Sequence, residues 1–164
     1  MFTMPKKSAV KSALLYLVLF FAMVGIDIMT KDLVVARIPL GRTIPIIEDV
    51  IHFTYVRNTG AAFGIFANNT AALTVVSVVI LLALLGGLFC TKPKDESVKL
   101  AFCMICSGAV GNLIDRISLG YVVDFIDFRL INFAVFNLAD CFVCIGAFLL
   151  VIYILFHKDS PNQN

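Results

Sequence analysis

Residues 120–140, GYVVDFIDFRLINFAVFNLAD, lie between two long apolar segments and contain three aspartates, Asp124, Asp127 and Asp140. A carboxylate beside a lipid core is costly to ionise, so an acid in this position is a candidate for function. Two acids that share one proton titrate as a pair, so that one takes a proton from water while the other donates one. We expect Asp124 and Asp140 to form such a pair at the mouth of a membrane-embedded bundle, with Asp127 as the alternative partner of Asp124.

The composition indicates an α-helical integral membrane protein. The chain has 164 residues, of which 60% are hydrophobic and only 15% charged, and its mean hydropathy is +0.98. A helix needs ~20 apolar residues to cross a bilayer, and four segments come close to this length: residues 13–29, 70–90, 100–117 and 138–156. We therefore predict four transmembrane helices in a single membrane domain, residues 1–164. The formal net charge of +2, without a basic stripe, predicts no nucleic-acid partner.

Residues 30–69, between the first two spans, have a different composition. They mix β-branched residues, prolines and glycines, which favours short strands and turns. Around position 53, apolar and polar residues alternate with a loose period of two, which predicts a small sheet lying on the membrane surface. The segment ends in NTGAAFG, residues 58–64, whose glycines permit close backbone approach. A simple turn into the next helix explains this last stretch equally well.

The distribution of basic residues predicts the orientation of the chain. Four spans place both termini on the same side of the membrane, and that side carries seven of the thirteen Lys and Arg residues. All the lysines except Lys31 lie there, whereas all five arginines lie on the other side. By the positive-inside rule, both termini are expected in the cytoplasm, with Asp124 and Asp140 facing outward. The first apolar segment resembles a signal peptide, but three later spans favour a retained helix.

The aspartates also have structural explanations. Asn137, followed three residues later by Asp140, is typical of a helix N-terminus, where a negative charge is favourable. A salt bridge to Arg116 or Arg129 is the alternative explanation for Asp124.

Other charged residues of the spans suggest ion pairs. Asp27 and Lys31 are four residues apart, in the order that favours an ion pair within one helix. Asp115 beside Arg116 suggests a charge pair at the membrane interface. In the same span, small residues such as Gly108 allow helices to approach closely.

We expect no metal ion. Cys103-x-x-Cys106 and Cys141-x-x-Cys144 are two CxxC units, but counting from the expected helix ends places them on the order of 12 Å apart along the membrane normal. That separation is too large for one zinc ion, so we interpret these cysteines as small apolar helix residues. Serine catalysis is not expected either, because no GxSxG motif is present and both histidines lie outside the spans.

Three blocks closely resemble a known family: VRNTGAAFGIF at residues 56–66, GNLIDRISLGYVVDFIDF at 111–128 and FNLADCFVCIG at 136–146. Together with the Asp27 and Lys31 pair, they occur in the order and spacing of bacterial lipoprotein signal peptidases (signal peptidase II). The resemblance extends over nearly the whole chain. It implies an aspartic endopeptidase of the bacterial cytoplasmic membrane, which removes the signal peptide of a prolipoprotein by cutting just before a diacylglyceryl-modified cysteine.

The resemblance also implies roles for single residues. The catalytic pair would be Asp124 and Asp140 rather than Asp127, and the sheet between the first two helices would be the small extracytoplasmic β-cradle of the family. Asp27 and Lys31 would have a structural or lipid-surface role. The implied partners are a lipidated prolipoprotein and membrane lipids, with no cofactor, and we expect a monomer. The residues implied to shape the substrate site are Asn58, Gly60, Gly108, Asn112, Arg116, Asn137 and Ala139.

Two other classes of protein are compatible with the residues alone. In a proton-coupled transporter or channel subunit, Asp27, Asp124 and Asp140 would relay protons. Such a relay predicts acids near the middle of the bilayer, whereas these acids gather at helix ends on one side. A non-enzymatic membrane scaffold would instead tolerate replacement of each acid by its amide.

Overall fold

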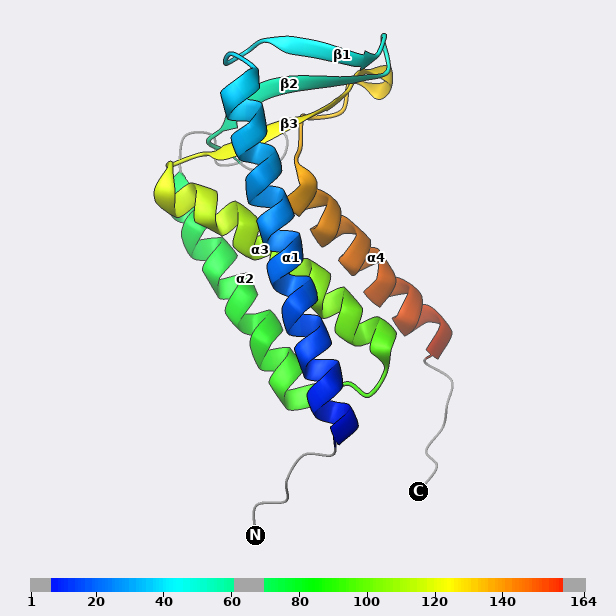
Figure 1. Ribbon diagram of the computed structural model, residues 1–164. Coiled ribbons are helices and arrows are strands. Elements are labelled where there is room, and N and C mark those ends of the chain that lie inside the picture. Colours follow the sequence, from blue (N-terminus) through cyan, green and yellow to red (C-terminus); the bar gives the residue numbers. More distant parts are fainter. Residues whose placement is uncertain (1–6, 61–69, 158–164) are drawn as a thin grey trace.

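Four long helices form a bundle that carries a small sheet at one end (Figure 1). The computed structural model describes residues 7–60 and 70–157. All four helices are long and apolar enough to cross a membrane, as the composition predicted. Their bounds are α1 Lys7–Arg37, α2 Thr70–Thr91, α3 Glu96–Ser118 and α4 Leu138–His157.

Helix α3 lies at the centre of the bundle and packs against each of the other three helices. Glycines allow its close approach to α4. A methyl group at Gly108 would overlap the carbonyl oxygen of Ala139, and one at Gly146 would lie 2.7 Å from the carbonyl oxygen of Ala101. The two helices are therefore in backbone contact along their length, as the small residues of the third span suggested.

Helix α1 is longer than the expected first span. Residues 30–37, expected to begin the segment outside the membrane, continue the helix to Arg37. The Thr30 hydroxyl donates a hydrogen bond to the carbonyl oxygen of Ile26 (2.9 Å), and the last turns contribute Val34 to a core beneath the sheet. Because Val34 is buried in this core, the helix continues through residues 30–37, where strands and turns were predicted.

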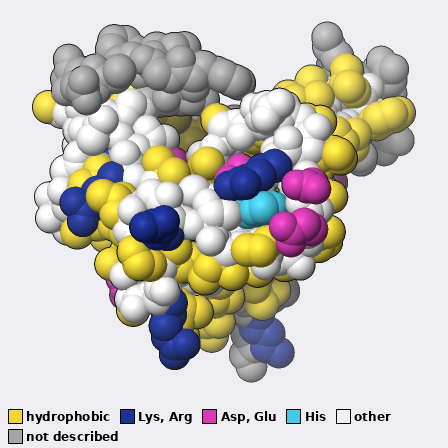
Figure 2. Space-filling view, turned by 90° about the horizontal axis from the view of Figure 1, so that it is seen from above, with side chains coloured by type: hydrophobic (Ala, Val, Ile, Leu, Met, Phe, Trp, Pro, Cys, Tyr) yellow, Lys and Arg dark blue, Asp and Glu magenta, His cyan; other side chains and the backbone are white. Residues whose placement is uncertain are grey.

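The sheet has three antiparallel strands in the order β1-β2-β3, with β1 at Thr43–Ile47, β2 at Ile51–Asn58 and β3 at Val122–Phe128. The first two form the sheet expected between helices one and two. The third comes from the stretch after α3, where no strand was predicted. Seen from above, charged side chains and a histidine gather on the sheet end of the molecule (Figure 2).

The chain returns from β3 to the bundle through the short helix η2, Arg129–Ile131. Phe136 then forms an isolated antiparallel bridge with Ile126 of β3, in which the Phe136 N–H donates to the Ile126 carbonyl at 3.1 Å. Because α4 begins two residues later, its first turn lies directly beside β3. This connection brings Asp124 and Asp140 to the same place.

Candidate active site

Asn137 connects the two acids at the junction of the sheet and the bundle. Its side-chain amide donates a hydrogen bond of 2.6 Å to Oδ1 of Asp124. Its backbone N–H donates to Oδ2 of Asp140 (3.1 Å), and its Oδ1 accepts from the Asp140 N–H (3.0 Å). The last two bonds form a reciprocal cap at the start of α4. The helix cap predicted from the sequence is confirmed, and the same asparagine also holds the second acid.

Asp124 is almost completely buried, with 2% of its surface exposed. Burial raises the pKa of its carboxyl group from 3.8 to about 7, although hydrogen bonds from Asn58 and Asn137 act in the opposite direction. The negative charge of Asp140 contributes to raising this pKa. The two carboxyl groups are therefore electrostatically coupled, and one of them is in a position to hold a proton near neutral pH.

Asn58, at the end of β2, supplies the second amide to Asp124. Its Nδ2 donates to Oδ2 of Asp124 at 2.8 Å, while its own Oδ1 accepts the backbone N–H of Gly60 at 2.9 Å. The Gly60 bond fixes the orientation of the amide, because only the Oδ1 atom accepts from an N–H. Both residues were implied to belong to the site; Asn58 contacts Asp124 directly, and Gly60 contacts only Asn58.

Asn112, on α3, links Asp140 to the rest of the site. Its Nδ2 donates to Oδ1 of Asp140 at 2.7 Å, and its Oδ1 accepts from the amide of Asn137 at 3.0 Å. The same oxygen accepts from Nζ of Lys31 at 3.0 Å. A continuous chain of hydrogen bonds therefore runs from a buried ammonium group in α1 to both carboxylates.

Lys31 lies at the centre of a buried charge cluster. Its ammonium is 2.8 Å from Asp27, four residues earlier, and 3.1 Å from Asp115 of α3. Only 2% of the lysine is exposed. The ion pair predicted within the first span is confirmed, but Asp115 was expected to pair with its neighbour Arg116 at the interface. It instead faces Lys31 and accepts the backbone N–H of Val123 at 3.0 Å, so it ties α1 and α3 to the sheet.

Asp27 also anchors the first turn of α4. Its Oδ1 accepts the backbone N–H of Ala139, a fully buried residue, at 2.9 Å. A methyl group at Gly111 would lie 2.5 Å from Oδ2 of Asp27, so the carboxylate fits only because α3 has no side chain there. Asp27 therefore positions the helix turn that contains Asp140.

Arg116 lies one helical turn beyond Asn112 on α3. Its guanidinium donates to the Asn112 carbonyl at 3.4 Å, and its charge interacts with those of Asp140 and Asp124. Among the described residues, no ion pair joins it to Asp124. Arg129, the other candidate, pairs with Asp127 at 3.0 Å. The salt-bridge explanation for Asp124 is therefore wrong, because amides rather than guanidinium groups contact that carboxylate.

Asp127 does not lie beside Asp124. Side chains three residues apart on a strand point to opposite faces, and Asp127 accepts hydrogen bonds from Thr54 (2.6 Å) and Arg129 (3.0 Å) on its own face. The alternative pairing of Asp124 with Asp127 is thus not formed.

The two CxxC units differ in the faces that they occupy rather than in depth. Close contacts of Gly146 with Ala101 and Ile105 place the middle of α4 level with that part of α3, so the vertical separation expected from the sequence is wrong. Cys103 lines a cavity that faces α1 and α2, whereas Cys144 is exposed. Among the described residues, no three His, Cys, Asp or Glu side chains are grouped as metal ligands.

Comparison with known proteins agrees with this arrangement. The family model described as "Signal peptidase (SPase) II" matches residues 19–156. The chain belongs to the signal peptidase II family. It is 46% identical over 153 residues to the lipoprotein signal peptidase of Nostoc sp., covering 93% of this chain and 96% of that protein. With the lipoprotein signal peptidase of Clostridioides difficile it shares 43% identity over 151 residues, covering 91% of this chain and 100% of that protein.

The fold matches solved structures as well. A bacterial membrane enzyme determined by the in meso method at 2.3 Å resolution superposes with a TM-score of 0.84 at 28% identity, covering 91% of this chain and 92% of that one. A second such enzyme, determined at 1.9 Å, gives a TM-score of 0.79 at 31% identity, with coverage of 88% and 94%. The four-helix membrane fold with a small sheet is therefore shared with these solved bacterial membrane enzymes.

Proposed function

We propose that this protein is an intramembrane aspartic endopeptidase that removes signal peptides from diacylglyceryl-modified prolipoproteins, cutting before the lipidated cysteine, with Asp124 and Asp140 as the catalytic pair. The names of the relatives support the substrate class. The observation that carries the catalytic assignment is that Asn137 donates hydrogen bonds to both carboxylates at once. Two acids held by one asparagine are arranged to exchange protons with the same substrate group.

The chemistry follows from the unequal surroundings of the two acids. Asp140 accepts N–H bonds from Asn112 and from the start of α4, where negative charge is stabilised. Asp124 is buried and has a pKa of about 7, so its carboxyl group stays protonated up to near-neutral pH. We assign Asp140 as the base that takes a proton from the attacking water, and Asp124 as the acid that donates a hydrogen bond to the developing oxyanion and then a proton to the leaving amine.

The remaining implied residues would position these groups. Asn58 and Asn137 fix the Asp124 carboxyl, with Gly60 orienting the first of these amides. The close contact of Gly108 with the Ala139 carbonyl holds α3 against the first turn of α4. Arg116 is free to orient the substrate backbone or its lipid-bearing end.

The topology supports an orientation of the chain in the membrane. The start of α1 and the end of α4 lie at the end of the bundle away from the sheet (Figure 1), and the lysines concentrate there. We propose that this end is cytoplasmic and that the catalytic pair faces outward. A single chain supplies every group of the site, so a monomer forming one membrane domain would suffice. The acyl chains of the substrate would remain in the bilayer during cleavage.

The decisive experiment is cleavage of a lipidated precursor by the purified protein, compared with the unlipidated precursor. Asp124→Asn and Asp140→Asn should each abolish cleavage while the protein still inserts into membranes. Asp127→Asn, the same change on the same strand, should retain cleavage because that carboxylate faces Thr54 and Arg129. Complete processing by either Asp124→Asn or Asp140→Asn would refute the catalytic pair, and equal cleavage of both precursors would refute the requirement for lipid.

The transporter alternative has less support. Asp27 and Asp115 are engaged with Lys31, and the chain belongs to a peptidase family. Proton flux into substrate-free vesicles that disappears in Asp124→Asn would favour that alternative.

A further inference from the structure

A cavity lies in the bundle away from the carboxylates. Its volume is about 600 Å³, and it is an open hollow between α1, α2 and α3 near the end of the bundle opposite the sheet. Phe20, Leu85, Leu88 and Phe102 are among its apolar lining residues. This volume falls within the range of ~300–1,000 Å³ typical of sites for small molecules. None of the residues that bind Asp124 or Asp140 lines it, so it is a separate feature of the fold.

The cavity extends from the helix ends into the membrane. Its lining runs from Ser12 to Phe20 on α1 and from Lys99 to Cys106 on α3. At ~1.5 Å per residue these stretches are about 10–12 Å long, while one leaflet contributes ~15 Å to the hydrocarbon core. The cavity is therefore deep enough to take a chain that lies parallel to the lipids of that leaflet.

Polar groups are confined to one end of the cavity. Tyr16 donates to Glu96 at 2.8 Å and Ser12 donates to it at 3.4 Å, while Lys99 pairs with it at 2.7 Å. Lys92 lines the same end and, within the described part of the chain, forms no ion pair. It has a left-handed backbone (φ 44°) just after α2, a position usually taken by glycine.

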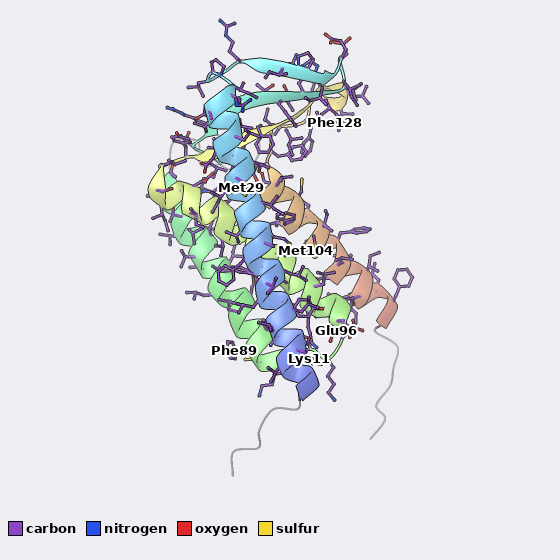
Figure 3. All side chains as sticks on the ribbon, in the orientation of Figure 1. Lys11, Met29, Phe89, Glu96, Met104 and Phe128 are labelled. Carbon is purple, nitrogen blue, oxygen red and sulfur yellow. The ribbon has the colours of Figure 1, made fainter. Side chains whose placement is uncertain are left out.

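The sum of the charges at this end is positive. At this end, the lysines whose side chains the structure describes are Lys11, Lys92, Lys94 and Lys99, against the two acids Asp95 and Glu96. Figure 3 places Lys11 and Glu96 together at the end of the bundle away from the sheet. Basic groups next to a membrane attract anionic headgroups, whereas the positively charged amino-terminal region of a signal peptide would be repelled.

We propose that this cavity binds an acyl chain of an anionic phospholipid from the leaflet at that end, with the phosphate of its headgroup at Lys92. Tyr16 then lies at the depth of the headgroups, where tyrosine is favoured, and the apolar residues enclose the chain. The bound lipid fills the space between three helices without approaching the carboxylates. This site is independent of the proposed peptidase mechanism.

The absence of tryptophan allows a direct test. Phe20 lines the cavity, whereas its neighbour Phe21 is 63% exposed on the outside of the helix. The full-length variants Phe20→Trp and Phe21→Trp therefore carry one fluorophore each at almost the same depth. Each is placed in phosphatidylcholine vesicles containing a small fraction of either brominated phosphatidylglycerol or brominated phosphatidylcholine, and quenching is measured against the fraction of brominated lipid.

We expect the fluorescence of Phe20→Trp to be quenched at a lower fraction of brominated phosphatidylglycerol than of brominated phosphatidylcholine. The difference should be about fivefold, the effect of one lysine near an anionic lipid. Phe21→Trp should respond equally to both lipids. Adding Lys92→Gln to Phe20→Trp should remove the preference, and adding Lys94→Gln, which does not line the cavity, should leave it.

Equal quenching of Phe20→Trp by the two lipids, or a preference that survives Lys92→Gln, would overturn the proposal. If neither lipid quenches Phe20→Trp and its fluorescence changes when a lysine-containing signal peptide is added, the cavity binds that peptide. This result would also overturn the proposal. A second measurement uses the unmodified protein: native mass spectrometry after mixing with equal amounts of the two lipids should show one retained phosphatidylglycerol. Retention of both lipids to the same extent would again refute the selective site.

Discussion

Substitution of Asn137 separates its two roles at the site. Its backbone N–H and Oδ1 cap α4, while its side-chain N–H group binds Asp124 at 2.6 Å. Asn137→Ala removes both the capping oxygen and the donor. Asn137→Ser keeps an oxygen that caps a helix about as well as asparagine does, but its shorter side chain lacks the amide that reaches Asp124.

The magnitudes follow from these two losses. Removing a helix cap costs ~1 kcal/mol of stability, so Asn137→Ala should unfold at a lower temperature, while Asn137→Ser should remain close to the unchanged protein. Asp124 becomes negatively charged as it gives up its proton in the reaction, and a hydrogen bond to a charged group contributes ~1.5–3 kcal/mol. If it acts in the transition state, its loss lowers kcat/KM by about 10- to 150-fold. Both variants should show this loss of activity.

The pH dependence provides an independent measurement. The hydrogen bond from Asn137 lowers the pKa of Asp124 from the higher value that burial would otherwise give. Removing the amide therefore raises this pKa, and an acid that must be protonated stays protonated to higher pH. In Asn137→Ser, the decline of kcat/KM at alkaline pH should move upward from its position near pH 7.

The assay is cleavage of a lipidated precursor peptide at several pH values, with thermal unfolding followed in the same detergent. Asn132→Ser, the same change at an exposed residue outside the site, should leave kcat/KM unchanged. The reasoning fails if Asn137→Ser cleaves within about twofold of the unchanged protein. It also fails if Asn137→Ser loses stability and activity in the same proportion as Asn137→Ala, because the asparagine would then act only as a helix cap.

Three further predictions concern stability, each measured by unfolding in detergent. Lys31→Met leaves two buried carboxylates without their cation and should lower the free energy of unfolding by ~3–5 kcal/mol. Its control Lys99→Met breaks a more exposed pair and should cost at most ~1 kcal/mol. Equal losses of stability in the two variants would contradict the buried cluster. Gly111→Ala forces a methyl group to 2.5 Å from a carboxylate oxygen and should cost ~1–3 kcal/mol, while Gly86→Ala, with open space around it, should be neutral or stabilising. The folded-state pKa of Asp124 is raised to about 7, so its contribution to stability is complete below about pH 4 and is lost as the pH rises through 7. Asp124→Asn should therefore flatten the dependence of the free energy of unfolding on pH. An unchanged pH dependence would show that another group causes it.

Short-range patterns predicted the local parts of the site correctly. Asn137 and Asp140 are three residues apart and form the cap that this spacing indicates. Asp27 and Lys31 are four residues apart and form the expected ion pair. Such contacts are set by helix geometry, so they can be read from spacing alone. The family resemblance indicated further residues without showing what they contact.

Local spacing missed the contacts made over long distances in the sequence. Asp115 was assigned to Arg116 beside it, but its partner is Lys31 of another helix. The third strand was missed because its burial depends on pairing with β2, which lies more than sixty residues earlier. A buried charge pairs with an opposite charge that is buried beside it, even when the two residues are far apart in the sequence.

The sequence by itself determined that this is a four-helix membrane protein. A chain that crosses a lipid core as helices needs long apolar segments, and four such segments make up most of this sequence. It also determined the cap at the start of α4 and the ion pair within α1. Only the tertiary structure decided that β3 runs alongside the start of α4, that Asn137 reaches both acids, and that Lys31 lies behind them. These contacts depend on how the helices and the sheet pack together, since the free energy of a buried polar group is set by all the groups that surround it.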